Sequence, residues 1–292
     1  MPLTTTGDLV ARSAAARGAV GAFNVITLEH VEAVISGAEL ADRPVVLQVS
    51  ENAVAFRYGR LLPLARAAVA AAERAAVPVA LHLDHVVSDR LLRQAPDAGF
   101  SSVMYDASRL PYGENLAATR AAADWAHAQG LWVEAELGQV GGKHGAPALD
   151  AHAPGARTDP REARAFVADS GVDALAVAVG TTHAMTERTA ALDHALLKSL
   201  AAALDVPLVL HGSSGVPDAE LTAAVAGGIS KVNVGTALNA AMTAAIREYL
   251  AAHPRAVDSR TYLAVGREAM VRTVAAILGV LDPGASGGDG TA

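Results

Sequence analysis

The chain contains no cysteine, so neither disulfide bonds nor thiolate metal ligands are available to it. Any metal site must therefore use histidine, aspartate or glutamate. Aromatic residues make up only 4% of the 292 residues, whereas hydrophobic residues make up 52%. This composition predicts an aliphatic core and alanine-rich helices that pack closely together.

Two further absences limit the partners of the protein. The sequence has no basic tract and its formal net charge is −7, which argues against binding to nucleic acid or to anionic membranes. Residues 1–20 contain neither the continuous apolar run of a signal peptide nor a membrane-spanning segment of about 20 apolar residues. We therefore expect a cytoplasmic protein whose partners are small molecules.

What the chain does contain is a regular alternation of short apolar runs and longer alanine- and leucine-rich stretches. The expected strands are residues 18–25, 44–50, 78–85, 101–107, 131–138, 172–180, 206–212 and 229–235. Helical patterns follow them, for example at 28–42, 61–76 and 159–171. This alternation is typical of parallel strands that are buried on both faces and joined by amphipathic helices.

The pattern predicts an α/β protein, a (β/α)8 TIM barrel formed by residues 1–281, because right-handed crossovers place every helix outside the strands. The alternative is an open doubly wound sheet. That fold would concentrate polar residues at one switch point, whereas polar residues follow nearly every strand here. Residues 259–281 predict an additional C-terminal helix, residues 282–292 a disordered tail, and residues 141–160 a mobile loop beside the active site.

Three histidines stand where an apolar run gives way to polar residues, namely His85, His183 and His211. In a barrel they would converge at the carboxyl-end rim, where three neutral imidazoles can hold a divalent metal and leave a coordination position open. Asp84, beside the first of them, is well placed to transfer a proton to a substrate oxygen.

The other histidines have simpler interpretations. His82 is expected to be a core histidine with a satisfied hydrogen bond. The histidines of predicted helices and loops are expected at the surface; they are His30, His127, His152, His194 and His253.

Carboxylates and lysines complete the list of reactive side chains. Glu134 and Glu136 share a strand face, and we expect Glu136 to be associated with the metal, a buried ion pair being the alternative. Asp106 and Ser108 follow the fourth strand. The lysines are Lys143, Lys198 and Lys231; none fits the pattern of a desolvated Schiff-base lysine, and Lys231, on the eighth strand, comes nearest to it.

The seventh and eighth strands both end in small polar motifs, HGSSG at 211–215 and NVGT at 233–236. Their exposed amides and short hydroxyl side chains can surround an anion closely. In (β/α)8 barrels the loops after these two strands often hold a phosphate group, so we expect a phosphate site here.

At these residues the chain resembles the class II, metal-dependent ketose-bisphosphate aldolases, the family of fructose- and tagatose-1,6-bisphosphate aldolases. The resemblance runs from about residue 18 to about residue 275 and follows the family order. It is carried by GAFNV, VxLQxS, HLDH, SVMxDAS, VEAELGxxGG, AVxVGTxH, PLVLHGxSG and KVNVGT. The resemblance implies reversible cleavage of a phosphorylated ketose to dihydroxyacetone phosphate and an aldehyde, with Zn²⁺ and a monovalent cation, Na⁺ or K⁺.

The resemblance also implies roles for individual residues. His85, His183 and His211 would bind zinc, and Asp84 would exchange a proton with the C4 hydroxyl. The dihydroxyacetone phosphate half would be held by Gly212, Ser214, Asn233 and Thr236, on a floor completed by Asn24, Gln48 and Ser50. Arg260, in the motif DSR at 258–260, would reach the site of a neighbouring subunit and hold the distal phosphate, which implies a homodimer or homotetramer.

Two positions depart from the family pattern. Family members usually continue GG with an acidic pair, whereas this chain has Gly142-Lys143-His144; a neutral His144 can act as a base near neutral pH, and the pair could also attract an acidic group. Ala184 follows the second zinc histidine where glycine is usual. Two rival readings therefore stay open: a relative with a different acceptor aldehyde or only a sugar-phosphate-binding role, and a zinc hydrolase with Asp84 as its base.

Overall fold

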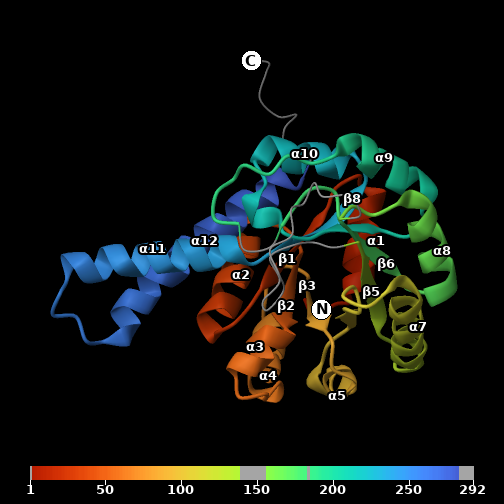
Figure 1. Cartoon of the computed structure of the whole chain (residues 1–292). Helices are drawn as coiled ribbons and strands as arrows, with labels where there is room; N and C mark the ends of the chain where they lie inside the picture. Colours follow the sequence, from red (N-terminus) through yellow and green to blue (C-terminus); the bar gives the residue numbers. More distant parts are fainter. Residues whose placement is uncertain (1, 139–155, 183–184, 283–292) are drawn as a thin grey trace.

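The computed structural model describes residues 2–138, 156–182 and 185–282 and forms a closed barrel of eight strands surrounded by helices (Figure 1). Neighbouring strands pair in parallel in sequence order, and β1 pairs with β8 to close the barrel. The strands are β1 (Val20–Asn24), β2 (Val45–Ser50), β3 (Val79–Val86), β4 (Ser102–Tyr105), β5 (Trp132–Leu137), β6 (Ala174–Val177), β7 (Leu208–Leu210) and β8 (Ile229–Val234). The expected TIM barrel is confirmed, and the open-sheet alternative is wrong.

Helices follow the strands on the outside of the barrel. They are α2 (Leu28–Ala41), α3 (Glu51–Phe56), α4 (Leu62–Ala72), α5 (Asp89–Leu92), α6 (Ala95–Ala98), α7 (Tyr112–Ala128), α8 (Pro160–Ser170), α9 (His194–Ala203), α10 (Asp218–Ala226) and α11 (Thr236–Ala252). The expected C-terminal helix is α12 (Ser259–Val280). None of the helices in the described ranges combines the length and the apolar character that crossing a bilayer requires.

A helix before β1, α1 (Thr6–Ala15), was not expected from the sequence. Leu9 and Val10 of α1 pack with Val46 and Ala80, which are buried residues of β2 and β3. The available signal was Thr5, whose side chain accepts a hydrogen bond from the backbone N–H of Asp8 and caps the helix. An apolar cluster therefore fills one part of the barrel interior, while polar side chains fill another.

The last two helices depart from the barrel. Figure 1 shows α11 and α12 as a helical hairpin that extends well beyond the ring of strands, with the C-terminal half of α12 returning to pack beside α2. Within α11 only Leu238 is buried. The hairpin is therefore attached to the barrel at its base and has little core of its own.

Candidate active site

A β-bulge in β3 brings His85 into the mouth of the barrel. The pairing of β3 with β4 shifts register between Leu83 and Val86, and His85 has a left-handed backbone with φ of 48°. Strict alternation would point His85 away from His82 and Asp84, which face the interior. The bulge reverses that direction, and the His85 ring lies edge-on to the His211 ring with centroids 4.9 Å apart.

His85, His211 and Glu136 form a cluster that could hold a metal ion, because each offers a ligand atom within 4.8 Å of the others. His183 and Ala184 lie outside the described residues. The chain just before them is described and runs against the loop after β7: a methyl group at Gly212, where φ is +66°, would lie 2.6 Å from the carbonyl oxygen of Thr182. This close approach requires glycine at position 212.

Carboxylates orient both described imidazoles. Nδ1 of His85 lies 2.7 Å from Oδ2 of Asp106, whose other oxygen accepts hydrogen bonds from the backbone and hydroxyl of Ser108. Nε2 of His211 lies 2.8 Å from Oε1 of Glu134. Because an ionised carboxylate can only accept, these nitrogens carry the protons, and Nε2 of His85 and Nδ1 of His211 present lone pairs. Such carboxylate–histidine pairs are typical of metal centres.

Asp84 is only 1% exposed and faces the same space. Its Oδ2 accepts a hydrogen bond of 3.4 Å from Nε2 of Gln48, which also donates to Oδ1 of Asn24. Its Oδ1 has no hydrogen-bond partner among the residues that the structure describes. Ser50 lies beside Asp84 in the β2–β3 register, but its hydroxyl accepts from the backbone N–H of Ala53 and caps α3.

His82 is a buried core histidine, as expected from the sequence. It is 0% exposed, and its Nδ1 lies 2.7 Å from the hydroxyl of Ser102. Burial and, to a lesser extent, the nearby Lys231 ammonium lower the pKa of His82 to about 3. The imidazole is therefore neutral at physiological pH.

A buried ion pair between Lys231 and Glu134 was not anticipated. Lys231, which the sequence indicated as the lysine nearest to a desolvated Schiff-base pattern, lies in β8 and is 0% exposed. Its Nζ donates to Oε2 of Glu134 at 2.8 Å and to Oδ1 of Asn233 at 2.7 Å. Burial acts to raise the pKa of Glu134, but Lys231 and the hydrogen bond from His211 outweigh it and hold that pKa far below its usual range. The available signal was the two-residue alternation that places Lys231 on the same face as Asn233.

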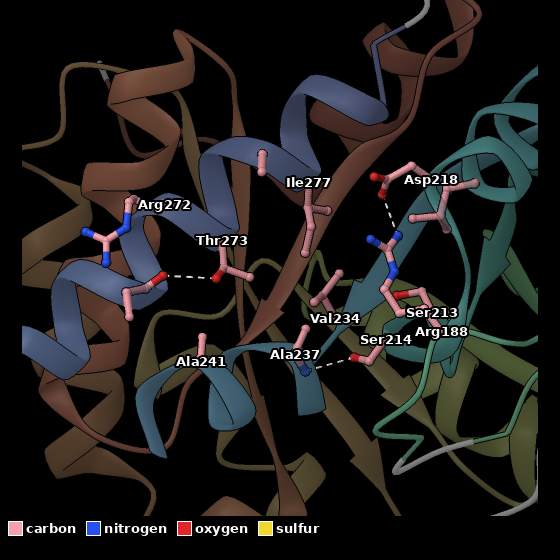
Figure 2. Close-up of a pocket in the computed structure, with 13 residues that line it drawn as sticks. Arg188, Ser213, Ser214, Asp218, Val234, Ala237, Ala241, Arg272, Thr273 and Ile277 are labelled. Atoms are coloured by element: carbon pink, nitrogen blue, oxygen red, sulfur yellow. Dashed lines mark hydrogen bonds and ion pairs between the residues drawn. The ribbon is translucent and has the colours of Figure 1, made fainter. Parts of the chain in front are cut away.

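At the expected phosphate site, the loop after β7 is hydrogen-bonded to β8 and to the start of α11. The Ser213 hydroxyl donates to the backbone carbonyl of Asn233 at 2.5 Å, and the Ser214 hydroxyl accepts from the backbone N–H of Ala237 at 3.1 Å. Thr236 begins α11, so the positive end of that helix faces the loop. Figure 2 shows both serines at the edge of a cavity of about 440 Å³ that is also lined by α10, α11 and α12.

Comparison with known proteins places this geometry in a family. The model of the family described as fructose-bisphosphate aldolase class-II matches residues 4–284. The chain belongs to this family. It is 37% identical over 276 residues to the fructose-bisphosphate aldolase of Geobacillus stearothermophilus. The aligned region covers 94% of this chain and 95% of that relative. Aldolases of this family are carbon–carbon lyases, and the protein is an enzyme of that class.

Solved structures agree with the assignment. The YdjI aldolase from Escherichia coli K12 is similar with a TM-score of 0.81 and 30% identity, covering 97% of this chain and 99% of that chain. The crystal structure of a candidate fructose-1,6-bisphosphate aldolase from Coccidioides immitis is similar with a TM-score of 0.84 and 28% identity, covering 96% and 98% of the two chains. The fold of the aldolase is thus matched over nearly its whole length.

One expected feature of the aldolase lies outside the described residues, and another, Arg260, is described away from its own barrel mouth. Gly142, Lys143 and His144 lie outside the described residues, as does most of the expected loop at 141–160. Arg260 is described, but it begins α12 at the far end of the hairpin (Figure 1), where its side chain is 89% exposed. Its guanidinium is bound to the carboxylate of Asp258 by contacts of 2.6 to 3.1 Å.

The surface expectation for the remaining histidines is wrong for His30. This residue of α2 is 3% exposed and contacts the hydroxyl of Thr27 at 3.0 Å and the side-chain oxygen of Asn239 in α11 at 3.2 Å. Its position on the inner face of α2 buries it, and this burial lowers its pKa. The expectation is confirmed for His127 and His253, which are exposed; His194 is half-buried, and His152 lies outside the described residues.

Proposed function

We propose that this protein is a zinc-dependent aldolase that reversibly cleaves a phosphorylated ketose, fructose 1,6-bisphosphate or a close relative, to dihydroxyacetone phosphate and an aldehyde. One observation carries the proposal: the buried Asp84 and the oriented cluster of His85, His211 and Glu136 share a single barrel mouth with the serine- and glycine-rich loops. A carbon–carbon lyase of this kind needs a metal site, a proton-transfer group and an anion site together.

The side chains at the mouth fit a zinc ion. Oε2 of Glu136 and Nδ1 of His211, two acceptor atoms, lie 3.5 Å apart, an arrangement that a cation between them would stabilise. We propose His85, His183 and His211 as its ligands and Glu136 as an associated carboxylate, because imidazole and carboxylate are the zinc ligands open to a chain without cysteine. When bound, zinc acts as a Lewis acid that stabilises the negative charge on the ketose oxygens as the carbon–carbon bond breaks.

Asp84 moves the proton in this scheme. Its buried Oδ1 would take the proton of the C4 hydroxyl while the bond between C3 and C4 breaks, which releases the aldehyde. The hydrogen bond from Gln48 holds the other oxygen of Asp84 in place. The carbanion left at C3 then takes a proton, for which we propose His144 as the donor. Reversal of the same transfers forms the new bond in the synthetic direction.

The phosphate groups are assigned to two places. We propose that Gly212, Ser214, Asn233 and Thr236 hold the phosphate of the dihydroxyacetone half, over a floor of Asn24, Gln48 and Ser50, with a monovalent cation beside it. The start of α11 supplies backbone N–H groups there. The distal phosphate would meet Arg260 of a second copy, since Arg260 lies at the exposed end of the hairpin. This arrangement requires a homodimer or a homotetramer.

A cleavage assay tests the proposal. Fructose 1,6-bisphosphate should yield dihydroxyacetone phosphate, and dialysis against a chelator should abolish this activity while added Zn²⁺ restores it. Borohydride added with dihydroxyacetone phosphate should leave the activity intact, because the Lys231 amine is paired with Glu134. Chelator-resistant activity or inactivation by borohydride would refute the proposal. A panel of aldehydes offered with dihydroxyacetone phosphate then identifies the preferred acceptor.

A further inference from the structure

We propose that Lys231 is a positioning residue of the metal centre, which holds Glu134 and Asn233 on two sides of His211 and so fixes the direction of that imidazole. This inference rests on the proposed function, because it assigns His211 to the metal. It adds a residue that touches neither metal nor substrate.

The contacts form a closed ring of four side chains. Nζ of Lys231 donates to Glu134 and to Asn233 at 2.8 and 2.7 Å. Nε2 of His211 donates to the second carboxylate oxygen of Glu134 at 2.8 Å, and Nδ2 of Asn233 packs 3.0 Å from the same nitrogen as a steric neighbour. The four residues come from β5, β8 and the end of β7. Lys231 is therefore opposite His211 in the ring and bound to both of its neighbours.

The ring has no substitute for the ammonium group. Glu134 is 0% exposed, and burying a carboxylate without a cation is strongly unfavourable because the charge loses its hydration. Among the residues that the structure describes, Lys231 is the only buried lysine or arginine. Because an ammonium group only donates, it also determines that the oxygen of the Asn233 amide turns toward it and the nitrogen toward His211.

The pairing separates this role from that of a covalent nucleophile. A Schiff-base lysine attacks as a neutral amine, usually after desolvation or beside another cation. Nζ of Lys231 instead donates to a carboxylate and to an amide oxygen, so it is held between two acceptors within the barrel. Its effect on the reaction must therefore pass through the residues that it holds.

The first test is the affinity of the purified full-length protein for Zn²⁺, measured by competition with a chromophoric chelator. Lys231→Met removes the charge and keeps most of the stem; Lys198→Met changes an exposed lysine and is the matched control. Loss of an outer-shell partner typically weakens metal binding about 10- to 100-fold, which we expect for Lys231→Met and not for Lys198→Met. The absorption spectrum of the Co²⁺-loaded protein should change in the same variant only.

A double variant keeps the test valid if Lys231→Met fails to fold. Glu134→Gln with Lys231→Met removes both buried charges and should fold. If Lys231 acts through Glu134, the Zn²⁺ affinity of the double variant should equal that of Glu134→Gln alone. Wild-type affinity in Lys231→Met or in the double variant would overturn the inference. A wild-type protein that binds no Zn²⁺ would instead overturn the proposed function itself.

Discussion

The barrel interior and the α11–α12 hairpin hold their candidate substrate residues in opposite ways. Gln48 and Asp84 are each 1% exposed and bound to neighbouring strands, so the register of one chain sets their positions. The Arg260 side chain is 89% exposed, and its guanidinium donates to the carboxylate of Asp258, two residues away. The interior is therefore a preorganised candidate site, whereas the hairpin presents an exposed guanidinium for which we propose a target on a second copy. The predictions below test that difference.

The largest effect is expected from Asp84→Ala. General acid–base catalysis typically contributes about 10²- to 10⁴-fold, so kcat should fall by that factor while the Zn²⁺ content stays at the wild-type level. Steady-state cleavage assays and metal analysis measure the two quantities. Asp124→Ala, at an exposed position of α7, is the matched control. Unchanged kcat in Asp84→Ala would remove this residue from the mechanism.

The second prediction concerns stability in the two regions. Phe23 of β1 is 0% exposed, whereas Val257 in the hairpin is 93% exposed. Phe23→Ala should lower the free energy of unfolding by about 3–5 kcal/mol, because it opens a cavity in the core. Val257→Ala should change it by less than about 0.5 kcal/mol. Urea unfolding followed by circular dichroism decides the matter, and equal losses would contradict the contrast.

The third prediction is a pH dependence that originates in the interior. Burial lowers the pKa of His82 from 6.5 to about 3 in the folded protein. As the pH falls, the His82 imidazole is therefore protonated in the unfolded chain before it is protonated in the folded protein. The neutral, buried imidazole contributes its full share of the free energy of unfolding above the pKa of the unfolded chain. That share is lost as the pH falls from 6.5 toward 3. The loss should approach about 1.4 kcal/mol per pH unit. The free energy of unfolding should therefore differ less between pH 7.0 and pH 5.5 in His82→Gln than in the wild type. An identical difference in the two proteins would argue against this role of His82.

The smallest kinetic effect is expected from Arg260→Ala. The variant loses a charge-assisted hydrogen bond to the distal phosphate, so KM for a ketose bisphosphate should rise by roughly 10- to 100-fold. Cleavage of a ketose 1-phosphate should be unaffected, because it lacks the distal group.

Mixing subunits shows whether Arg260 acts on its own barrel or on another. Arg260→Ala and Asp84→Ala subunits, refolded together, should form some sites with both groups intact if Arg260 acts on a second copy. Activity should then exceed the sum of the two separate variants. A purely additive mixture would show that each chain uses its own Arg260.

Individual residues show which features of the fold and of the candidate site could be predicted from the sequence. The eight strands and the positions of His85 and His211 at strand ends follow from apolar runs that end in polar residues, a pattern that needs no tertiary information. The bulge in β3 does not, since the same letters HLDH fit a regular strand. His30 was misassigned because the sequence does not state which face of α2 turns inward. The ring of Lys231, Glu134, His211 and Asn233 joins strands that are up to 97 residues apart in the chain.

The order of apolar and polar residues along the chain was by itself enough to determine the barrel and the aldolase family, because these depend on local periodicity and on motifs within single segments. Only the tertiary structure decided which atoms face one another: the re-aimed His85, the lysine paired inside the barrel and the arginine placed outside it. Those outcomes depend on strand register and on the desolvation of charged groups, and both arise only when distant segments come into contact.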